Sequence, residues 1–372
     1  MTHSRFLATL FALAAVCGAG LPAAPAAGIY MIDVGQGNAV LLVSPSGETM
    51  LMDTGARFAA DRVIGFMRDI GVKQLDYLLI SHFEEDHMGA ATALAEKIPI
   101  RAFVDHGENV TYGKSLEWWK QRRAPWIRPD GGQRIDATYD AYRQVRAKAR
   151  HIAVKCGDRI PIQGVDAVVV SSGGQVLTKP LPGAGAPNSA CAGVERRAED
   201  DAEDGQSVGV LISYGKFRAV NLGDLTWNNA NALFCPRNLL GPVDAYVVTH
   251  HAQSLPRDLG GYYRGLSCCP PSELNGLRPR VALLTLGSQG HKLGTSEAID
   301  TVRKSPGLED LWQTQKIVAG GEQGHNSADD FIANIGGKSD RTGYIKLSAN
   351  RDGSFTATNS RNGFSKTYPA RK

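Results

Sequence analysis

The stretch that most constrains the fold of this 372-residue chain is residues 77–95, YLLISHFEEDHMGAATALA. Its apolar run Tyr77–Ile80 predicts a buried strand, and the small residues of Met88–Ala95 predict a helix. Four side chains of the kinds that bind metals lie between these elements: His82, Glu84, Asp86 and His87. A strand that ends at His82 and turns tightly into a helix would gather these groups around one point. The stretch therefore predicts a divalent cation site, and the alternative is a solvated acidic turn.

A strand that ends on a metal-type residue is predicted at three further places. TMLMDTG predicts a strand that ends on Asp53, and the hairpin SVGVLISYGKFRAVNLGDL ends on Asp224. VDAYVVTHHA predicts a strand that ends on His250 and His251. Strand ends on one edge of a sheet share one crevice, where sheets of this type place their sites. We expect the four strand ends to converge.

The rest of the pattern predicts a mixed α/β chain. Short strands with glycine turns over residues 29–53 indicate an antiparallel meander. Helices are expected near 61–70, 139–150, 228–233 and 295–305. Residues 173–206, rich in Gly, Ala and Pro and then in acidic residues, predict a mobile surface insertion, and residues 343–368 predict a C-terminal hairpin.

Taken in order, LMDTG, SHFEEDH, LGD and VVTHH resemble the motifs of the metallo-β-lactamase fold hydrolases. Within that family, MIDVGQGNAVLLVSPSGETMLMDTG and VVTHHAQS are similar to the hydrolase domain of ComEC-type DNA-uptake proteins and their stand-alone relatives. The resemblance spans about Tyr30 to His291. It implies a four-layer αββα sandwich with one or two metal ions between the sheets.

The resemblance also implies a set of metal ligands. In chain order these are His82, Glu84, Asp86, His87, Asp224 and His250. Asp224 matches the aspartate that bridges two metals, and His251 competes with His250 for the last position. Asp53 matches a buried aspartate that orients ligands without binding metal, and Asn38 stands where relatives often have aspartate.

Two departures from the family pattern affect the metal. Glu84 replaces the second histidine of the family's His-x-His-x-Asp-His motif, and with Asp86 and Asp224 it makes the site rich in carboxylates. This donor set weakens the preference for Zn²⁺ and admits Mn²⁺ or Fe. The family's middle histidine is also missing, and His106 is the substitute that the sequence offers.

If His106 does not fill that position, one of the two metal positions is incomplete. A single metal held by Asp86, His87 and His250, together with Asp224, is then the alternative to a pair.

The ligands predict hydrolysis by activated water. A divalent cation lowers the pKa of bound water toward 7, and two cations would clamp the attacking and leaving oxygens of a phosphodiester. Asp86 or Glu84 could accept the proton as general base. His251 and His291 are further catalytic candidates, because His291 follows a predicted strand among glycines and could donate to a substrate oxyanion; a surface turn is the alternative for His291.

Two weaker signals point to phosphate or nucleic acid. Lys292, beside His291, could contact phosphate. Aromatic and basic residues also alternate after residue 117, a mixture that can stack bases, although packing of a helix on the domain is favoured. These residues are Trp118, Trp119, Arg122, Arg123 and Trp126. His325 is expected to be a loop residue.

Residues 1–27 predict a secretory signal. Arg5 precedes the apolar run Phe6–Leu21, and PAAPAAG supplies the small residues that a signal peptidase reads. Removal of this segment would leave a hydrolase domain over residues 28–372, secreted or periplasmic and without an integral membrane segment. In an oxidising compartment we expect disulfides, with Cys156–Cys191 as the pair that closes the irregular segment.

The sequence thus predicts an exported metal-dependent hydrolase with one or two Zn²⁺ ions, or with Mn²⁺ or Fe. Small-molecule or nucleic-acid phosphodiesters are the expected substrates, by resemblance alone. The net charge of +4 permits nucleic-acid binding without indicating it. The alternatives are hydrolysis of a lactam, lactone or ester by the same fold, and a non-catalytic binding protein with a degenerate metal site.

Overall fold

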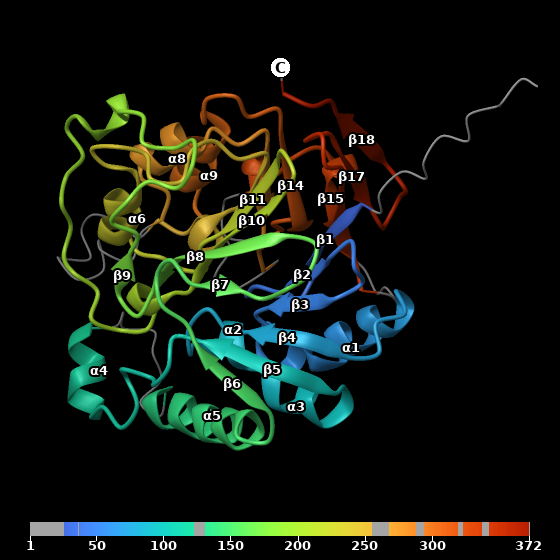
Figure 1. The fold of residues 1–372 in the computed structure, drawn as a ribbon. Coiled ribbons are helices and arrows are strands. Elements are labelled where there is room, and N and C mark those ends of the chain that lie inside the picture. The colour runs from blue at the N-terminus through green and yellow to red at the C-terminus, as the bar shows by residue number, and fades with distance from the viewer. Residues whose placement is uncertain are drawn as a thin grey trace, which may run out of the picture.

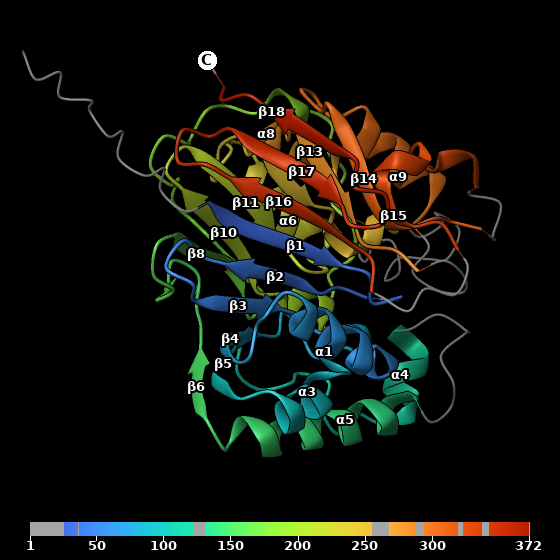
Figure 2. The same cartoon turned by 90° about the vertical axis from the view of Figure 1, so that its right-hand side faces the viewer.

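The computed structural model describes residues 26–35, 37–122, 131–254, 268–287, 294–318, 323–336 and 342–371. Two large sheets lie face to face with helices on their outer faces (Figure 1). Figure 2 shows the same layers from the side, with α1, α3 and α5 below one sheet and α8 and α9 beyond the other. The predicted αββα arrangement is confirmed. Within the described ranges, no helix has the length and apolar character needed to cross a bilayer.

The first sheet has the strand order β18-β17-β16-β1-β2-β3-β4-β5-β6. Its strands are β1 Ala27–Ile32, β2 Val40–Val43, β3 Thr49–Met52, β4 Leu75–Leu79, β5 Ile100–Asp105, β6 Arg150–Ala153, β16 Tyr344–Ala349, β17 Phe355–Asn359 and β18 Ser365–Tyr368. Pairing is antiparallel from β18 to β3 and parallel from β3 to β6. The meander β1–β2–β3 is as predicted. The C-terminal segment supplies three strands instead of a two-stranded hairpin, because β18 adds to β17.

The second sheet has the order β15-β14-β13-β12-β11-β10-β8-β7, and β9 pairs with β8. Its strands are β7 Arg159–Ile160, β8 Asp166–Ser172, β9 Gln175–Val176, β10 Gly209–Tyr214, β11 Phe217–Asn221, β12 Ala245–Val247, β13 Val281–Leu284, β14 Asp310–Gln315 and β15 Ile332–Asn334. The strands from β11 to β15 are parallel. Parallel strands covered on both faces are apolar throughout, which explains why every residue of β13, VALL, is buried.

The outer layers consist of helices. The α-helices are α1 Ala60–Asp69, α2 Glu85–Met88, α3 Ala91–Lys97, α4 Leu116–Arg122, α5 Gly131–Arg146, α6 Trp227–Phe234, α8 Pro271–Leu277 and α9 Ser296–Arg303. Short 3₁₀ helices are η1 Arg57–Ala59, η2 Ser189–Cys191, η3 Asp204–Gln206, η4 Thr249–Ala252, η6 Gln323–His325 and η7 Asp329–Phe331.

Three apolar clusters hold the layers together. The central cluster lies between the sheets and contains Met31 of β1 and Phe217 of β11. A second cluster packs α1, α3 and α5 onto the first sheet through residues such as Phe66. The third packs α6, α8 and α9 onto the second sheet through residues such as Leu233 and Ile299.

The helix predicted from Met88 to Ala95 is interrupted, because α2 ends before Gly89 and α3 begins at Ala91. A Cβ at Gly89 would lie 2.2 Å from the Glu85 carbonyl oxygen and 2.6 Å from the Arg57 nitrogen. Only glycine allows η1 to approach this closely. The helix expected to reach Arg150 also ends earlier, at Arg146, since Arg150 begins β6.

The predicted Cys156–Cys191 disulfide is wrong. Cys191 is bonded to Cys235, whose Cα lies 5.6 Å away just after α6, and Cys268 is bonded to Cys269. Cys156 is a free thiol whose Sγ lies 3.1 Å from the Gln175 carbonyl oxygen. The Cys191–Cys235 bond therefore attaches residues 173–206 to α6.

Residues 173–206 have little regular structure, as expected, but they do not stay at the surface. Glu203 is 1 % exposed and Asp204 is 2 % exposed. This segment therefore ends inside the protein, next to the residues that the sequence singles out.

Candidate metal centre

The four predicted strand ends meet at one edge of the two sheets. Asp53 follows β3, His82 follows β4, Asp224 follows β11, and His251 follows β12. Each of these side chains is at most 1 % exposed. The segments between them bring further carboxylates and imidazoles to the same place, and these form two groups.

The first donor set consists of Asp86, His87 and His251, whose ligand atoms all lie within 4.8 Å of one another. His251 Nε2 is 3.3 Å from His87 Nε2 and 3.5 Å from Asp86 Oδ2. Two imidazole nitrogens that face one carboxylate oxygen at these distances can share one cation as ligands.

The first donor set contains His251, the alternative to His250 that the sequence offered. His250, His251 and Ala252 have φ angles of 49°, 52° and 55°, so the chain makes a left-handed turn that begins three residues after the end of β12. This turn sends His251 toward His87, while His250 Nε2 lies 3.5 Å from Asp224 Oδ2. The sequence could not distinguish two adjacent histidines, because their directions depend on this backbone conformation.

Asp53 orients His87, as the resemblance implies. Its Oδ2 lies 2.8 Å from His87 Nδ1, and it also accepts hydrogen bonds from Ser81 Oγ and from Asn38 Nδ2. A carboxylate on Nδ1 fixes the imidazole ring and leaves Nε2 facing the donor set. Asn38 thus contacts Asp53, which in turn contacts the donor residue His87.

The second donor set consists of His82, Glu84 and Asp204. His82 Nε2 lies 3.4 Å from Asp204 Oδ1, is buried, and has no hydrogen-bond partner. Sequence reasoning missed Asp204 because it searched for a histidine at the family's middle position. The available signal was the acidic run AEDDAEDG, which ends three residues before the strand GVLISY.

Asp224 lies between the two donor sets. Its Oδ1 is 3.3 Å from His87 Nε2 and 3.4 Å from His251 Nε2. Its ligand atom also lies within 4.8 Å of ligand atoms of His82 and His87. Asp224 could therefore contribute a ligand atom to a cation at either donor set.

The electrostatics of the site favour a cation. Burial opposes protonation of His87, but the nearby carboxylates of Asp224, Asp53 and Asp86 outweigh it and hold the pKa of His87 well above its ordinary value. Buried carboxylates in this number require positive charge nearby. The buried His82 Nε2, which has no hydrogen-bond partner, and the two donor sets together fit divalent metal ions.

His106, the substitute that the sequence offers for the missing histidine, is in neither donor set. Its Nε2 lies 3.0 Å from Glu203 Oε2, so it contacts the neighbour of Asp204. His291 and Lys292 lie outside the described residues, as do Arg123 and Trp126.

Trp118, Trp119 and His325 belong to neither donor set. Trp119 is 2 % exposed and packs against Trp118 at a ring distance of 5.1 Å, as expected for helix packing. His325, the expected loop residue, forms a 2.9 Å ion pair with Asp300.

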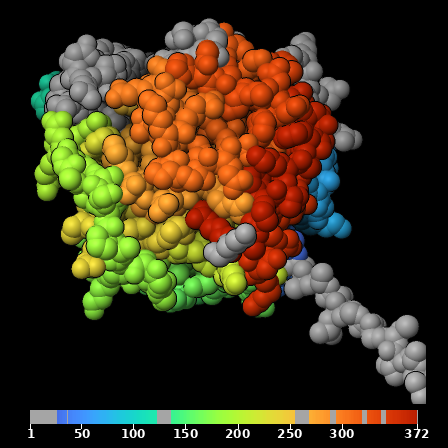
Figure 3. All heavy atoms as spheres, turned by 90° about the horizontal axis from the view of Figure 1, so that it is seen from above, coloured from blue at the N-terminus to red at the C-terminus, as the bar shows by residue number. Residues whose placement is uncertain are grey.

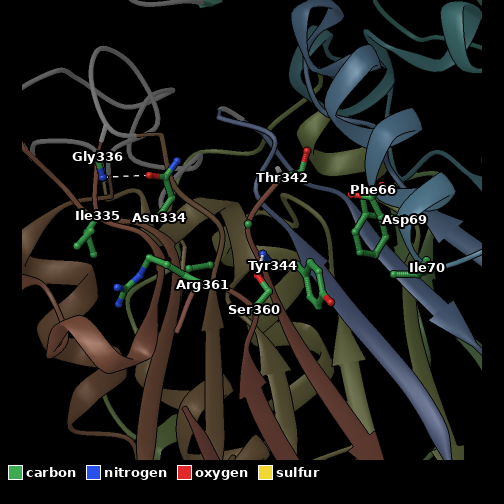
Figure 4. A pocket seen from close by; sticks show the side chains of 12 residues that line it. Phe66, Asp69, Ile70, Asn334, Ile335, Gly336, Thr342, Tyr344, Ser360 and Arg361 are labelled. Carbon is green, nitrogen blue, oxygen red and sulfur yellow. Dashed lines mark hydrogen bonds between the residues drawn. The ribbon is translucent and has the colours of Figure 1, made fainter. Parts of the chain in front are cut away.

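A cavity of about 730 Å³ lies between α1 and the ends of β15 and β16 (Figure 4). Its lining includes Phe66, Asn334, Tyr344 and Arg361, and it contains no residue of the two donor sets. Arg361 directs its guanidinium to the backbone carbonyl of Ile332. This cavity is therefore separate from the metal centre.

A buried carboxyl contacts the segment that precedes the left-handed turn. Glu273 of α8 is 0 % exposed, and its Oε1 lies 2.8 Å from both Tyr246 OH and Thr249 Oγ1. Thr249 directly precedes His250. Burial raises the pKa of Glu273 to about 7, against an ordinary value of 4.5.

We therefore expect Glu273 to make stability depend on pH. Between pH 4.5 and about 7 the folded chain holds a proton that the unfolded chain has released, so the free energy of unfolding falls as the pH rises. The total loss should be about 3 kcal/mol. Urea unfolding of chelator-treated wild type and Glu273→Gln at several pH values measures it. The difference between the two proteins isolates Glu273, and equal slopes in both would contradict the assignment.

Comparison with known families agrees with this architecture. Residues 32–176 match the family model described as the metallo-beta-lactamase superfamily. The chain is also 42% identical over 53 residues to the anaerobic nitric oxide reductase flavorubredoxin of Vibrio vulnificus (strain YJ016), and 43% identical over 53 residues to that of Aliivibrio fischeri (strain ATCC 700601 / ES114). Each match covers 14% of this chain and 11% of the relative, so the chain spans only a small part of these curated proteins.

Two solved structures illustrate the likeness in space. CmlA, a diiron beta-hydroxylase from Streptomyces venezuelae, has a TM-score of 0.41 at 13% identity, over 76% of this chain and 50% of that chain. MEM-A1, a subclass B3 metallo-beta-lactamase from a soil metagenome library, has a TM-score of 0.33 at 14% identity, over 54% and 61%. The described residues thus form an αββα sandwich, and residues 32–176 match the model of the metallo-beta-lactamase superfamily.

Proposed function

We propose that the protein is a metal-dependent hydrolase that holds two divalent ions and acts on phosphodiesters. The observation that carries this proposal is the position of Asp224 between the two donor sets. A shared carboxylate would keep two ions close together, which suits in-line displacement at phosphorus. The resemblance to ComEC-type hydrolase domains supports a phosphodiester as the substrate.

When bound, the ions would act as Lewis acids and lower the pKa of water toward neutrality. The protein's own residues supply orientation and a place for the proton. Asp53 fixes the His87 ring, and the Thr285 carbonyl and hydroxyl oxygens, each 3.1 Å from His251 Nδ1, fix His251. Asp86 or Glu84 would accept the proton of the attacking water.

The two donor sets should differ in metal preference. The first donor set supplies two imidazoles and one carboxylate, which suits Zn²⁺. The second donor set supplies one imidazole and two carboxylates, from Glu84 and Asp204, and these harder oxygens favour Mn²⁺ or Fe. We therefore propose that Mn²⁺ or Fe competes with Zn²⁺ mainly at the second donor set.

The same carboxylates favour a second candidate, redox chemistry at a pair of iron ions. The curated relatives that share 53 residues with this chain are named anaerobic nitric oxide reductases. Iron as the bound metal, together with metal-dependent turnover of a redox substrate and none of an ester, would replace hydrolysis with this candidate.

We also propose that the protein is exported, secreted or periplasmic, after loss of residues 1–27. The Cys191–Cys235 disulfide supports an oxidising compartment. A mature N-terminus near residue 28 in the exported fraction of the native host would test this, and an intact Met1 in the cytosol would contradict it.

The test of function combines metal analysis with hydrolysis of bis(p-nitrophenyl) phosphate. We expect about two equivalents of metal in wild type, and we expect Asp86→Ala to lower turnover at least about a hundredfold, since a metal position supplies several kcal/mol. Glu85→Gln is the matched control, because Glu85 lies in the same motif but in neither donor set. It should keep turnover within about twofold.

Each other outcome identifies an alternative. One equivalent of metal with Asp86-dependent turnover would support a metal-dependent hydrolase and contradict the presence of two metal ions. Cleavage of a chromogenic lactam or lactone, but not of the phosphodiester, would show that the substrates are cyclic amides or esters. No bound metal and no Asp86-dependent turnover would indicate a non-catalytic binding protein.

A further inference from the structure

Glu203, the residue before Asp204, has a buried carboxylate that is held from three sides. The side chain of Glu203 is 1 % exposed. Its Oε2 accepts a hydrogen bond from Phe83 N at 2.9 Å and lies 3.0 Å from His106 Nε2. Its Oε1 accepts one from Val110 N at 2.7 Å.

These contacts join separate segments of the second donor set. Phe83 lies between His82 and Glu84, so the bond to its N–H fixes the backbone that carries two of the three donors. Asp204, the third donor, follows Glu203 directly. One carboxylate therefore sets the distance between the His82–Glu84 segment and Asp204.

The chain after Asp204 is anchored separately. Val208 N donates to the Ser81 carbonyl oxygen at 2.8 Å, and Ser207 Oγ lies 3.4 Å from His82 Nδ1. On the other side, the Asn228 side chain bonds to the backbone of Arg197. That contact attaches the loop to α6, and Glu203 attaches it to the His82–Glu84 segment.

We propose that Glu203, oriented by His106, is a positioning residue for the second donor set. The proposal rests on the metal-dependent function above and assigns to this pair the placement of Asp204, which replaces the family's histidine. Without the Glu203 carboxylate, metal binding at the second donor set is weakened and metal binding at the first donor set is unchanged.

The carboxylate is required because both of its oxygens accept from backbone N–H groups. An amide has one acceptor oxygen, and its NH₂ group would face an N–H of Phe83 or Val110. The side chain in Glu203→Gln has nearly the same shape as glutamate. However, one hydrogen bond from a backbone N–H is replaced by an unfavourable contact between that N–H and the amide NH₂ group. Loss of such outer contacts typically weakens metal binding by about 10–100-fold.

The experiment is calorimetric titration of chelator-treated protein with Zn²⁺ alone and with Mn²⁺ alone. Wild type should bind two equivalents. Glu203→Gln should bind one equivalent with unchanged affinity and the second about 10–100-fold more weakly. Asp76→Asn is the matched control, because Asp76 is a buried carboxylate that accepts from Thr49 N at the opposite end of β4. It should bind two equivalents like wild type.

A pair of variants at His106 separates positioning from folding. His106→Gln keeps an N–H donor for Glu203 and should bind both equivalents within about threefold of wild type. His106→Ala removes the donor and should weaken the second equivalent about tenfold. Two unweakened equivalents in both Glu203→Gln and His106→Ala would overturn the inference. Absence of metal from wild type would instead overturn the proposed function.

Discussion

Asp224→Ala should abolish binding of both metals and lower hydrolysis by about a thousandfold or more. Asp224 lies within 3.4 Å of both Nε2 atoms of the first donor set and near His82 of the second. In the proposed two-metal arrangement its loss would remove a ligand from both positions at once, and a Lewis-acid contribution of about 4 kcal/mol corresponds to about three orders of magnitude in rate. Elemental analysis and turnover of bis(p-nitrophenyl) phosphate measure the two effects.

The control for Asp224→Ala is Asp166→Ala on the same sheet. Asp166 is exposed and pairs with Arg159, so both metals and full turnover should remain. If Asp224→Ala kept two equivalents of metal, Asp224 would not lie between two ions. The two-metal proposal would then fail even if turnover dropped.

Trp312→Ala should lower the free energy of unfolding by about 4 kcal/mol, the range expected for an aromatic side chain removed from a core. Trp312 of β14 is 0 % exposed and belongs to the cluster between the sheets. Its ring lies 4.8 Å from that of Phe331, and its Nε1 donates to Tyr368 OH at 3.0 Å. It thus connects the second sheet to β18 of the first. Figure 3 shows how the C-terminal part of the chain, orange to red, covers this side of the molecule.

Urea unfolding of metal-free protein measures this loss as a lower midpoint at constant slope. Phe58→Ala is the control, because Phe58 is 63% exposed and should change stability by no more than about 0.5 kcal/mol. A loss below about 1 kcal/mol for Trp312→Ala would show that β18 does not depend on this contact.

The sequence predicted the sheets and the position of the site because both follow from strand patterns. Asp53, His82 and Asp224 each end an apolar run, and a run of that kind fixes which edge of a sheet its last residue reaches. The same reasoning predicted α1 from its apolar spacing and α9 from its Thr295 cap, which accepts from Ala298 N.

The parts that could not be predicted depend on contacts distant in sequence or on single backbone angles. Asp204 joins His82 through a loop without periodicity, and its residue type departs from the family's histidine. The choice between His250 and His251 depends on three left-handed residues. Disulfide pairing cannot be read from spacing, and β18, with the mixed sequence SKTY, has no strand pattern of its own.

The pairing of β1 with β16 has a consequence for how the chain folds. Ala27 pairs with Ala349 and Ile32 with Tyr344. β1 therefore cannot complete its pairing until β16, near the C-terminus, has been synthesised. Contacts at such sequence separation form slowly. Until Tyr344–Ala349 has been synthesised, β1 presents unpaired N–H and C=O groups along one side, as an open edge that invites association with other chains. Truncated or stalled chains that end before β16 should therefore aggregate, even when the whole metal centre, which lies upstream, has already been made.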